Sequence, residues 1–261
     1  MAYQRVLLGR TGLDVGRLGV SASYGVPAAA VEEAVERGVN YLYWGSRRTR
    51  PFGDALSNLA PRRDRLVLVV QSYSPVASLV GVSLERALRA LRFAYADVLL
   101  LGMWNRPLPP RFLDAARDLR RRGLVRYLAV STHHRPLVPR LADSPVDIFH
   151  VRYNAVHRGA ETDVFPLLPP SPPGIVSFTT TCWGRLLKSR RIPPGERVPT
   201  AEDCYRFVLA QPAVHVVMTG PANAAQMRMA LSAWEKGPLD PGELAWMRRV
   251  GDAIYGRPRS R

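Results

Sequence analysis

The sequence has few cysteines, few lysines and no long hydrophobic run. Cys182 and Cys204 are the only cysteines among 261 residues, too few for a disulfide framework or for a metal site made of sulfur alone. No apolar stretch approaches the roughly 20 residues that a membrane-spanning helix requires, and the first residues lack the apolar core of a signal peptide. We therefore expect a cytoplasmic protein that does not bind a membrane.

Acidic residues are also scarce. The chain has 21 Asp and Glu against 37 Lys and Arg, a formal net charge of +16, and only Lys188 and Lys236 are lysines. Such a charge favours anionic partners, nucleic acid among them. Because arginine replaces lysine in a background rich in Ala, Gly, Pro and Val, part of this composition indicates a coding bias, although that bias leaves the shortage of acids unexplained. We do not expect nucleic acid to be the partner.

Apolar runs alternate with amphipathic runs along the chain, with little linker between them, which is typical of repeated βα units. The pattern predicts strands at residues 18–23, 40–43, 66–71, 97–101, 127–131, 147–153, 174–179 and 215–219. Helical patterns fill each gap, among them residues 28–37, 83–91, 111–122, 222–235 and 241–255. In residues 111–122 the spacing turns Leu113, Ala116 and Leu119 inward and leaves an arginine-rich outer face.

Eight strands, each followed by a helix, predict an α/β fold of the (β/α)8 barrel (TIM barrel) type. A doubly wound sheet is disfavoured because the glycines near residue 9 do not continue as G-x-G-x-x-G. A short N-terminal hairpin around residues 9–12 precedes the barrel, and an extra C-terminal helix follows it. The proline-rich stretches 166–173 and 192–199 fall within βα units and predict loops, so we expect one domain over residues 1–261.

Six segments carry a family resemblance in the right order along the chain. They are LGRTGLDVGRLGVSASYG, GVNYLYW, YADVLLL, GLVRYLAVST, RYNAVHRGAE and VVMTGPANAAQM. Over nearly its whole length the chain resembles the aldo-keto reductases. The resemblance implies a barrel that holds NADP(H) across the C-terminal ends of its strands and reduces carbonyls with a Tyr, Asp, Lys and His tetrad.

None of the four tetrad positions carries the family's residue. Tyr43 stands at the position of the aspartate, Gln71 at that of the lysine and Gly102 at that of the histidine. The loop at residues 46–49, which would supply the tyrosine, reads Ser-Arg-Arg-Thr. We therefore expect a divergent, oxidoreductase-derived enzyme that works without the tetrad. The alternative is a catalytically inactive pseudoenzyme that senses NADP(H) or binds a partner.

The positions that the resemblance assigns to the cofactor are only partly kept. They are Ser131, His150, Asn154 and Phe178 near the nicotinamide, and Gly220 and Gln226 near the adenosine. At His150 the family has a glutamine that reads the carboxamide, and Met229 and Ala230 replace a glutamate and an asparagine. The resemblance thus leaves NADP(H) binding open.

The expected mouth of the barrel is rich in Tyr, Trp, Arg and His. Our candidate catalytic residues are Tyr43, Tyr73, Arg47, Arg48 and His133, and our candidate substrate contacts are Trp44, Gln71, Trp104 and Arg152. Guanidinium groups pair with carboxylate or phosphate and stack on rings, so we expect a small anionic or aromatic substrate. A tyrosine would donate the proton, and an arginine beside it would lower the phenol pKa.

A purely structural reading of the same residues stays open. Aromatic residues at strand ends also plug barrels, and an Arg-Arg pair in a loop is usually solvated. We expect no metal site, because no HExxH, CxxC or paired-carboxylate spacing occurs.

Overall fold

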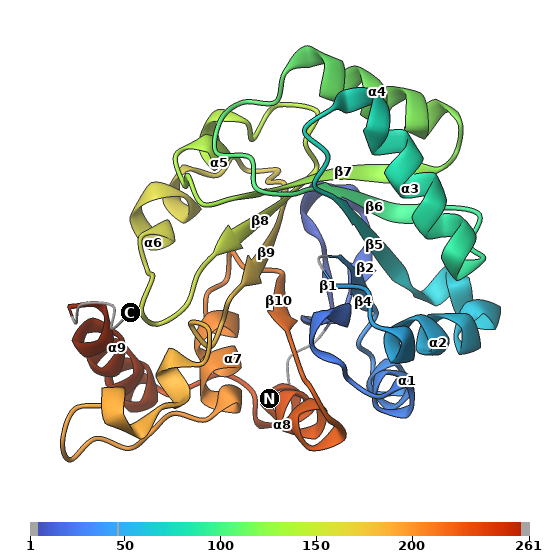
Figure 1. Cartoon of the computed structure of the whole chain (residues 1–261). Coiled ribbons are helices and arrows are strands. Elements are labelled where there is room, and N and C mark those ends of the chain that lie inside the picture. The colour runs from blue at the N-terminus through green and yellow to red at the C-terminus, as the bar shows by residue number, and fades with distance from the viewer. Residues whose placement is uncertain (1–4, 46, 257–261) are drawn as a thin grey trace.

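A closed barrel of eight parallel strands forms the centre of the molecule, in the order β10-β3-β4-β5-β6-β7-β8-β9 (Figure 1). The computed structural model describes residues 5–45 and 47–256, so Ser46 of the expected tyrosine loop lies outside the described residues. The barrel strands are β3 (Leu18–Ser21), β4 (Tyr41–Trp44), β5 (Val67–Ser72), β6 (Ala96–Leu101), β7 (Val125–Thr132), β8 (Ile148–Arg152), β9 (Gly174–Phe178) and β10 (Val216–Thr219). Each predicted strand is confirmed to within two residues at either end.

Helices surround the barrel on the outside (Figure 1). They are α1 (Ala28–Glu36), α2 (Arg50–Asn58), α3 (Ala77–Leu91), α4 (Pro110–Arg121), α5 (Leu137–Arg140), α6 (Ala160–Asp163), α7 (Ala201–Leu209), α8 (Ala224–Lys236) and α9 (Pro241–Tyr255). Shorter 3-10 turns are η1 (Gly9–Thr11), η2 (Ala22–Tyr24), η3 (Ala60–Arg65), η4 (Phe165–Leu167), η5 (Arg185–Leu187) and η6 (Ser189–Arg191). Within the described residues, no helix is both long and apolar enough to cross a bilayer.

Three helix predictions were wrong in extent. The segments after β7 and β8 contain only the single turns α5 and α6, because prolines interrupt the chain nearby and cannot continue a helix. Helix α3 begins at Ala77, six residues before the predicted start at Ser83, which lies inside the helix and caps nothing.

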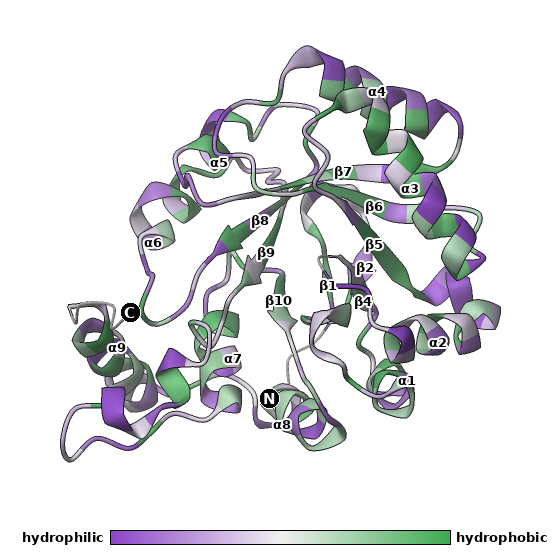
Figure 2. Ribbon diagram, viewed as in Figure 1, coloured by the Kyte–Doolittle hydropathy of each residue, from purple (hydrophilic) through white to green (hydrophobic). Residues whose placement is uncertain are grey.

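The outer helices are amphipathic, as the packing of α4 shows. Phe112, Ala116 and Leu119 are buried along one face, while its arginines occupy the other. Phe112 thus takes the inward place that we expected for Leu113, which is only partly buried. Figure 2 shows the same division throughout, with hydrophobic strands inside and hydrophilic colour on the outer faces of the helices.

The N-terminal hairpin closes one end of the barrel. Strands β1 (Val6–Leu7) and β2 (Asp14–Val15) pair antiparallel, which confirms the predicted hairpin. Leu8 and Leu13 pack with the side chains of the barrel interior. Gly9 has a φ of +51°, and a Cβ there would lie 2.4 Å from the backbone nitrogen of Gly174, so this turn requires glycine.

Buried carboxylates tie neighbouring strands together at the same end. Asp97 accepts a hydrogen bond from the Leu68 N–H at 2.9 Å and pairs with Arg63 at 2.8 Å and Arg126 at 3.2 Å. Asp147 accepts from a backbone N–H of β7 in the same way and pairs with an arginine of α4. The N-terminal end of the barrel is therefore filled and held by paired charges.

Candidate active site

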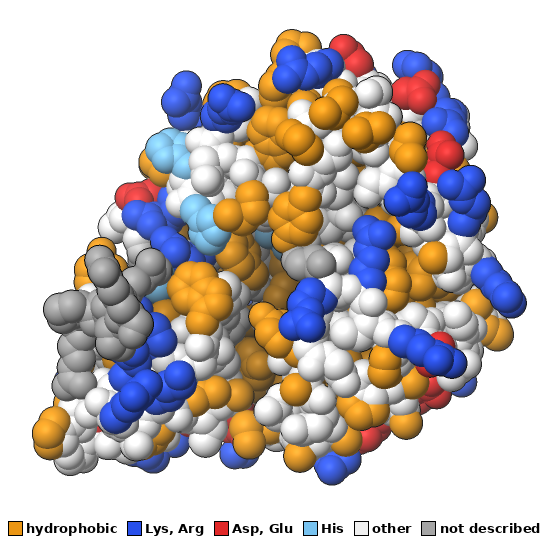
Figure 3. Space-filling view, viewed as in Figure 1, with side chains coloured by type: hydrophobic (Ala, Val, Ile, Leu, Met, Phe, Trp, Pro, Cys, Tyr) orange, Lys and Arg blue, Asp and Glu red, His pale blue; other side chains and the backbone are white. Residues whose placement is uncertain are grey.

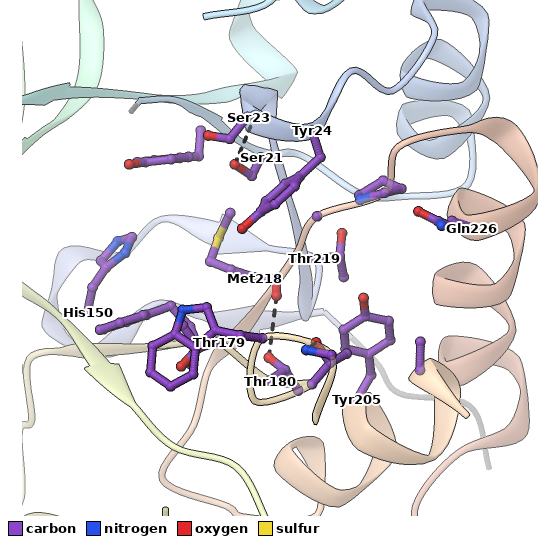
Figure 4. A pocket seen from close by; sticks show the side chains of 18 of the residues that line it. Ser21, Ser23, Tyr24, His150, Thr179, Thr180, Tyr205, Met218, Thr219 and Gln226 are labelled. Carbon is purple, nitrogen blue, oxygen red and sulfur yellow. Dashed lines mark hydrogen bonds between the residues drawn. The ribbon is translucent and has the colours of Figure 1, made fainter. Parts of the chain in front are cut away.

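A cavity of about 740 Å³ opens at the C-terminal ends of the strands, the position of active sites in barrel enzymes. All eight strands contribute a side chain to its wall, namely Ser21, Tyr43, Gln71, Leu100, Ser131, His150, Phe178 and Met218. The register sets several of these side by side, with Ser131 of β7 opposite His150 of β8. Figure 4 shows His150 at one end of the pocket and Gln226 at the other, with Met218 and Thr219 between them.

The wall of this pocket carries no formally charged side chain among the described residues. Aromatic, aliphatic and hydroxyl side chains form it, although the whole chain carries a net charge of +16. Figure 3 shows a face hollowed near its centre, with hydrophobic side chains in and beside the hollow and many Lys and Arg side chains around it. The candidate residues Arg47, Arg48 and Arg152 are not part of the wall.

The deepest polar contact of the pocket is a hydrogen bond between Tyr41 and His150. The Tyr41 hydroxyl lies 2.8 Å from Nε2 of His150, and both residues are buried. Burial lowers the pKa of His150 to about 3 and raises the pKa of Tyr41 far above its usual value. Both groups are therefore neutral across the physiological range.

Tyr43 lies on β4 two residues after Tyr41. Its ring centroid is 6.4 Å from that of His150. A Cβ at Gly45 would lie 1.8 Å from Cζ of Tyr43, so the ring folds over a glycine that cannot be replaced without moving it. Arg48 donates a hydrogen bond to the Gln71 carbonyl at 3.0 Å. Partial burial lowers the pKa of Arg48 and the nearby Tyr43 raises it, so Arg48 and Tyr43 are close enough for their charges to interact. Among the candidate arginines, Arg48 thus lies near the pocket.

Gln71 and Tyr73 fill the space beside Gly102. A Cβ at Gly102 would lie 2.2 Å from Nε2 of Gln71 and 2.5 Å from the ring of Tyr73. Both side chains line the pocket, and the Tyr73 side chain is half exposed. Two side chains from β5 and its loop thus fill the space that a side chain at residue 102 would need.

The loop after β9 has an unusual backbone. Thr179, Cys182 and Trp183 have φ values of +57°, +52° and +54°, a left-handed conformation that is strained for a β-branched residue such as threonine. Asn154 donates to the Thr179 carbonyl at 2.8 Å, so this predicted cofactor residue holds the loop instead of lining the pocket. Trp183 lines the pocket, and the Arg152 guanidinium lies 5.9 Å from its ring centroid. Sequence reasoning missed this loop, because Gly184 marks only one of its left-handed residues and the others are residue types that disfavour this conformation.

Two predicted substrate contacts pack toward the outer helices instead, Trp44 within the hydrophobic core and Trp104, which is partly buried, against it. Trp44 stacks on Phe52 of α2 at 6.2 Å, and Trp104 packs edge-on against Phe112 of α4 at 4.6 Å. Neither lines the pocket. Both instead join the barrel to its outer helices, which is the structural role left open above.

The other candidates at the rim, His133 and Arg47, also lie off the wall. The His133 ring meets Phe178 edge-on at 5.4 Å, and burial, followed by the charge of Arg152, lowers the pKa of His133. Arg47 is exposed, and its backbone N–H donates to the Ser23 hydroxyl at 3.5 Å.

Gly220 and Gln226 define the far end of the pocket. A Cβ at Gly220 would lie 2.5 Å from the ring of Tyr24, so glycine is needed for that ring to cover it. The Gln226 side chain accepts a hydrogen bond from the Ala222 N–H at 2.7 Å at the start of α8. Tyr205 of α7 completes this end. No sequence signal pointed to it, because α7 follows a long irregular loop.

In residues 5–45 and 47–256, no three His, Cys, Asp or Glu side chains lie close enough together to hold a metal ion. The nearest approach of two such groups beside the pocket is that of Cys182 Sγ and His157 Nδ1, at 3.7 Å.

Solved structures with the same architecture are aldo-keto reductases. The aldo-keto reductase AKR11C1 of Bacillus halodurans, in its holo form, superposes with a TM-score of 0.80 at 19% identity and covers 98% of this chain and 99% of its own. An aldo-keto reductase of Klebsiella pneumoniae, in complex with NADP and acetate, superposes with a TM-score of 0.78 at 20% identity, over 99% and 98% of the two chains. The chain therefore has the aldo-keto reductase fold and resembles these proteins over its whole length.

A curated relative agrees with this class. The uncharacterized oxidoreductase YqkF of Bacillus subtilis is 23% identical, over 97% of this chain and 98% of its own length. No family model matches the chain.

Proposed function

We propose that the protein is an oxidoreductase that reduces a small aromatic carbonyl compound with a nicotinamide dinucleotide, of which NADP(H) is the form bound in the Klebsiella neighbour. One observation carries the proposal. A single pocket at the C-terminal ends of the strands brings Tyr43 together with five of the six positions expected for the cofactor, namely Ser131, His150, Phe178, Gly220 and Gln226.

The pocket suits an extended dinucleotide. Its volume of about 740 Å³ falls within the range of ligand and cofactor sites. Phe178 offers a flat ring for stacking at one end, and at the other Gly220 lets Tyr24 close over the cavity without a clash. The Thr181 hydroxyl supplies an uncharged hydrogen-bond donor in between, and the Thr180 hydroxyl, which donates to the Met218 carbonyl, can still accept. When bound, the cofactor supplies the hydride.

Tyr43 is the proton donor in this proposal. Its side chain lines the pocket, and the nearby guanidinium of Arg48 stabilises the phenolate that remains once the proton has moved to the carbonyl oxygen. Tyr73 is the second candidate donor, because it also lines the pocket, beside Gln71.

The substrate is aromatic because Tyr24, Tyr73 and Trp183 border the cavity. An anionic group on the substrate would meet Arg48 or Arg152 only at the rim, since neither belongs to the wall. The bound substrate therefore places its ring inside and any carboxylate outside.

Oxidation of NADPH and NADH by the purified protein with a panel of aromatic aldehydes and ketones tests this function. We expect turnover that Tyr43→Phe lowers by at least about a hundredfold, since the phenol is the general acid. Tyr73→Phe is the matched control and should retain the rate. Full activity of Tyr43→Phe together with loss in Tyr73→Phe would transfer the role to Tyr73, and full activity of both variants would refute a tyrosine donor.

A pseudoenzyme that binds NADP(H) without turnover is the second candidate. The uncharged wall favours it, because no described lysine, aspartate or glutamate of the pocket could tune a tyrosine as the family tetrad does. Tight binding of NADPH, followed by its fluorescence, with no turnover of any carbonyl in the panel would establish this alternative.

A further inference from the structure

Tyr41 is a buried titratable residue that the proposed reduction does not use. It projects from β4 into the barrel, and its only hydrogen-bond partner in the described part of the chain is His150 of β8. In the closed order of strands, β4 and β8 stand four places apart, so this bond crosses the full width of the barrel. A cross-barrel contact of this kind fixes both side chains directly below the pocket.

The direction of this hydrogen bond follows from the surroundings of Tyr41. Its hydroxyl is buried, and a buried O–H that donates to nothing costs free energy. If Nε2 of His150 carried the proton and donated it to Tyr41, the tyrosine's own hydrogen would have no acceptor among the described residues. Tyr41 therefore donates to Nε2, and the proton of the neutral imidazole lies on Nδ1.

Nδ1 of His150 is accessible from the cavity. His150 lines the pocket, and Nδ1 has no hydrogen-bond partner in residues 5–45 and 47–256. Because burial holds the pKa of His150 near 3, this N–H stays a neutral donor at every pH at which the protein would work.

We propose that Tyr41 is a positioning residue, which fixes His150 as an Nδ1–H donor on the pocket floor, and that this donor takes an uncharged acceptor oxygen of carbonyl type. This inference deepens the proposed function, since both a carboxamide and a ketone offer such an oxygen. The floor would discriminate against an amine or ammonium group, because a donor facing a donor leaves both unpaired.

Nitrogen NMR of the 15N-labelled full-length protein tests the tautomer directly, without any ligand. We expect the His150 resonances, assigned by their disappearance in His150→Gln, to report a protonated Nδ1 and an unprotonated Nε2. Tyr41→Phe should move them toward a mixture of tautomers. Tyr127→Phe is the matched control, because Tyr127 also donates one hydrogen bond inside the barrel, to the Thr11 carbonyl at 2.5 Å, and should leave the His150 tautomer unchanged.

Titration with NADH and with AMP supplies the ligand test. We expect NADH to shift the Nδ1 resonance, and Tyr41→Phe to weaken NADH about tenfold while leaving AMP, which has no carboxamide, unaffected. A protonated Nε2 in the wild-type protein, or NADH binding that leaves His150 unmoved, would overturn the inference. Failure of NADH and NADPH to bind at all would instead overturn the proposed function, while the expected tautomer would still support the role of Tyr41.

Discussion

The two ends of the barrel use polar groups in opposite ways. At the N-terminal end, Asp97 is almost fully buried and is paired with two arginines and a backbone N–H. At the C-terminal end, the pocket wall carries hydroxyl, amide and imidazole groups and, among its described residues, no charge. The comparison teaches that the excess of arginine lies in the frame and on the outer surface, whereas the described wall of the pocket offers a ligand only shape and neutral hydrogen-bonding groups.

Asp97→Ala should have the largest effect of these substitutions. It should lower the stability of the barrel and leave the pocket unchanged. It leaves Arg63, whose side chain is only 14% exposed, and the Leu68 N–H without their partner. Removal of one member of a buried ion pair costs about 3–5 kcal/mol, which denaturant unfolding would measure.

Asp114→Ala is the matched control for that loss, because its pair with Arg117 is exposed on both sides. We expect at most about 0.5 kcal/mol there. Ligand affinity of the folded Asp97→Ala protein should stay unchanged, and a loss of affinity as large as the loss of stability would show that the two ends are coupled.

The pH dependence of the free energy of unfolding tests the same contrast at the pocket end of the barrel. The pKa of His150 is about 3 in the folded chain and about 6.5 when unfolded, so between these values the unfolded chain binds one more proton. Stability contributed by the neutral imidazole is complete above pH 6.5 and is lost as the pH falls toward 3, by up to about 1.4 kcal/mol per pH unit.

Unfolding experiments on His150→Gln isolate this effect, because the substitution removes the titrating group. Other groups also destabilise the fold in acid. Burial alone would raise the pKa of Glu161, but its hydrogen bonds with Arg248 and Tyr153 lower it overall. The difference in slope between wild type and variant is therefore the quantity to compare, and equal slopes would contradict the buried neutral state of His150.

The smallest expected effect concerns the extra phosphate that distinguishes NADPH from NADH. A charge-assisted hydrogen bond from Arg or Lys contributes about 1.5–3 kcal/mol, and no such side chain belongs to the described wall. We expect the two dissociation constants to differ by less than about tenfold, with little dependence on salt. A preference for NADPH of a hundredfold that disappears at high salt would show that a rim arginine reaches the cofactor.

The sequence predicted the eight barrel strands well, because each strand is a short apolar run between turn signals. Such a run can be recognised from its own residues, without knowledge of what it contacts in the fold. The alternation of side chains along β4 could also have predicted that Trp44 faces the outer helices. A strand that turns Tyr41 and Tyr43 inward must turn Trp44 outward. The pairing of Tyr41 with His150 was out of reach, because it exists only once the eight strands have closed.

The candidate site was harder to predict than the frame. Arg47 and Arg48 follow β4 and Arg152 is the last residue of β8, but a long side chain at a rim can turn toward the cavity or away from it, and sequence does not decide which. The left-handed residues after β9 were equally hidden, because Thr179 and Trp183 adopt a backbone that their residue types disfavour. Tertiary contacts such as the Asn154 hydrogen bond hold that backbone in place.

The crowding around Gly102 bears on how this pocket could change over evolutionary time. Histidine at position 102 would collide with Gln71 and Tyr73, which already occupy the room that its side chain needs. A single change from glycine to a larger residue at this position would overpack the pocket unless Gln71 and Tyr73 move or change with it. The side chains of Gln71 and Tyr73 therefore set the shape of this part of the pocket, and a larger residue at position 102 would change that shape.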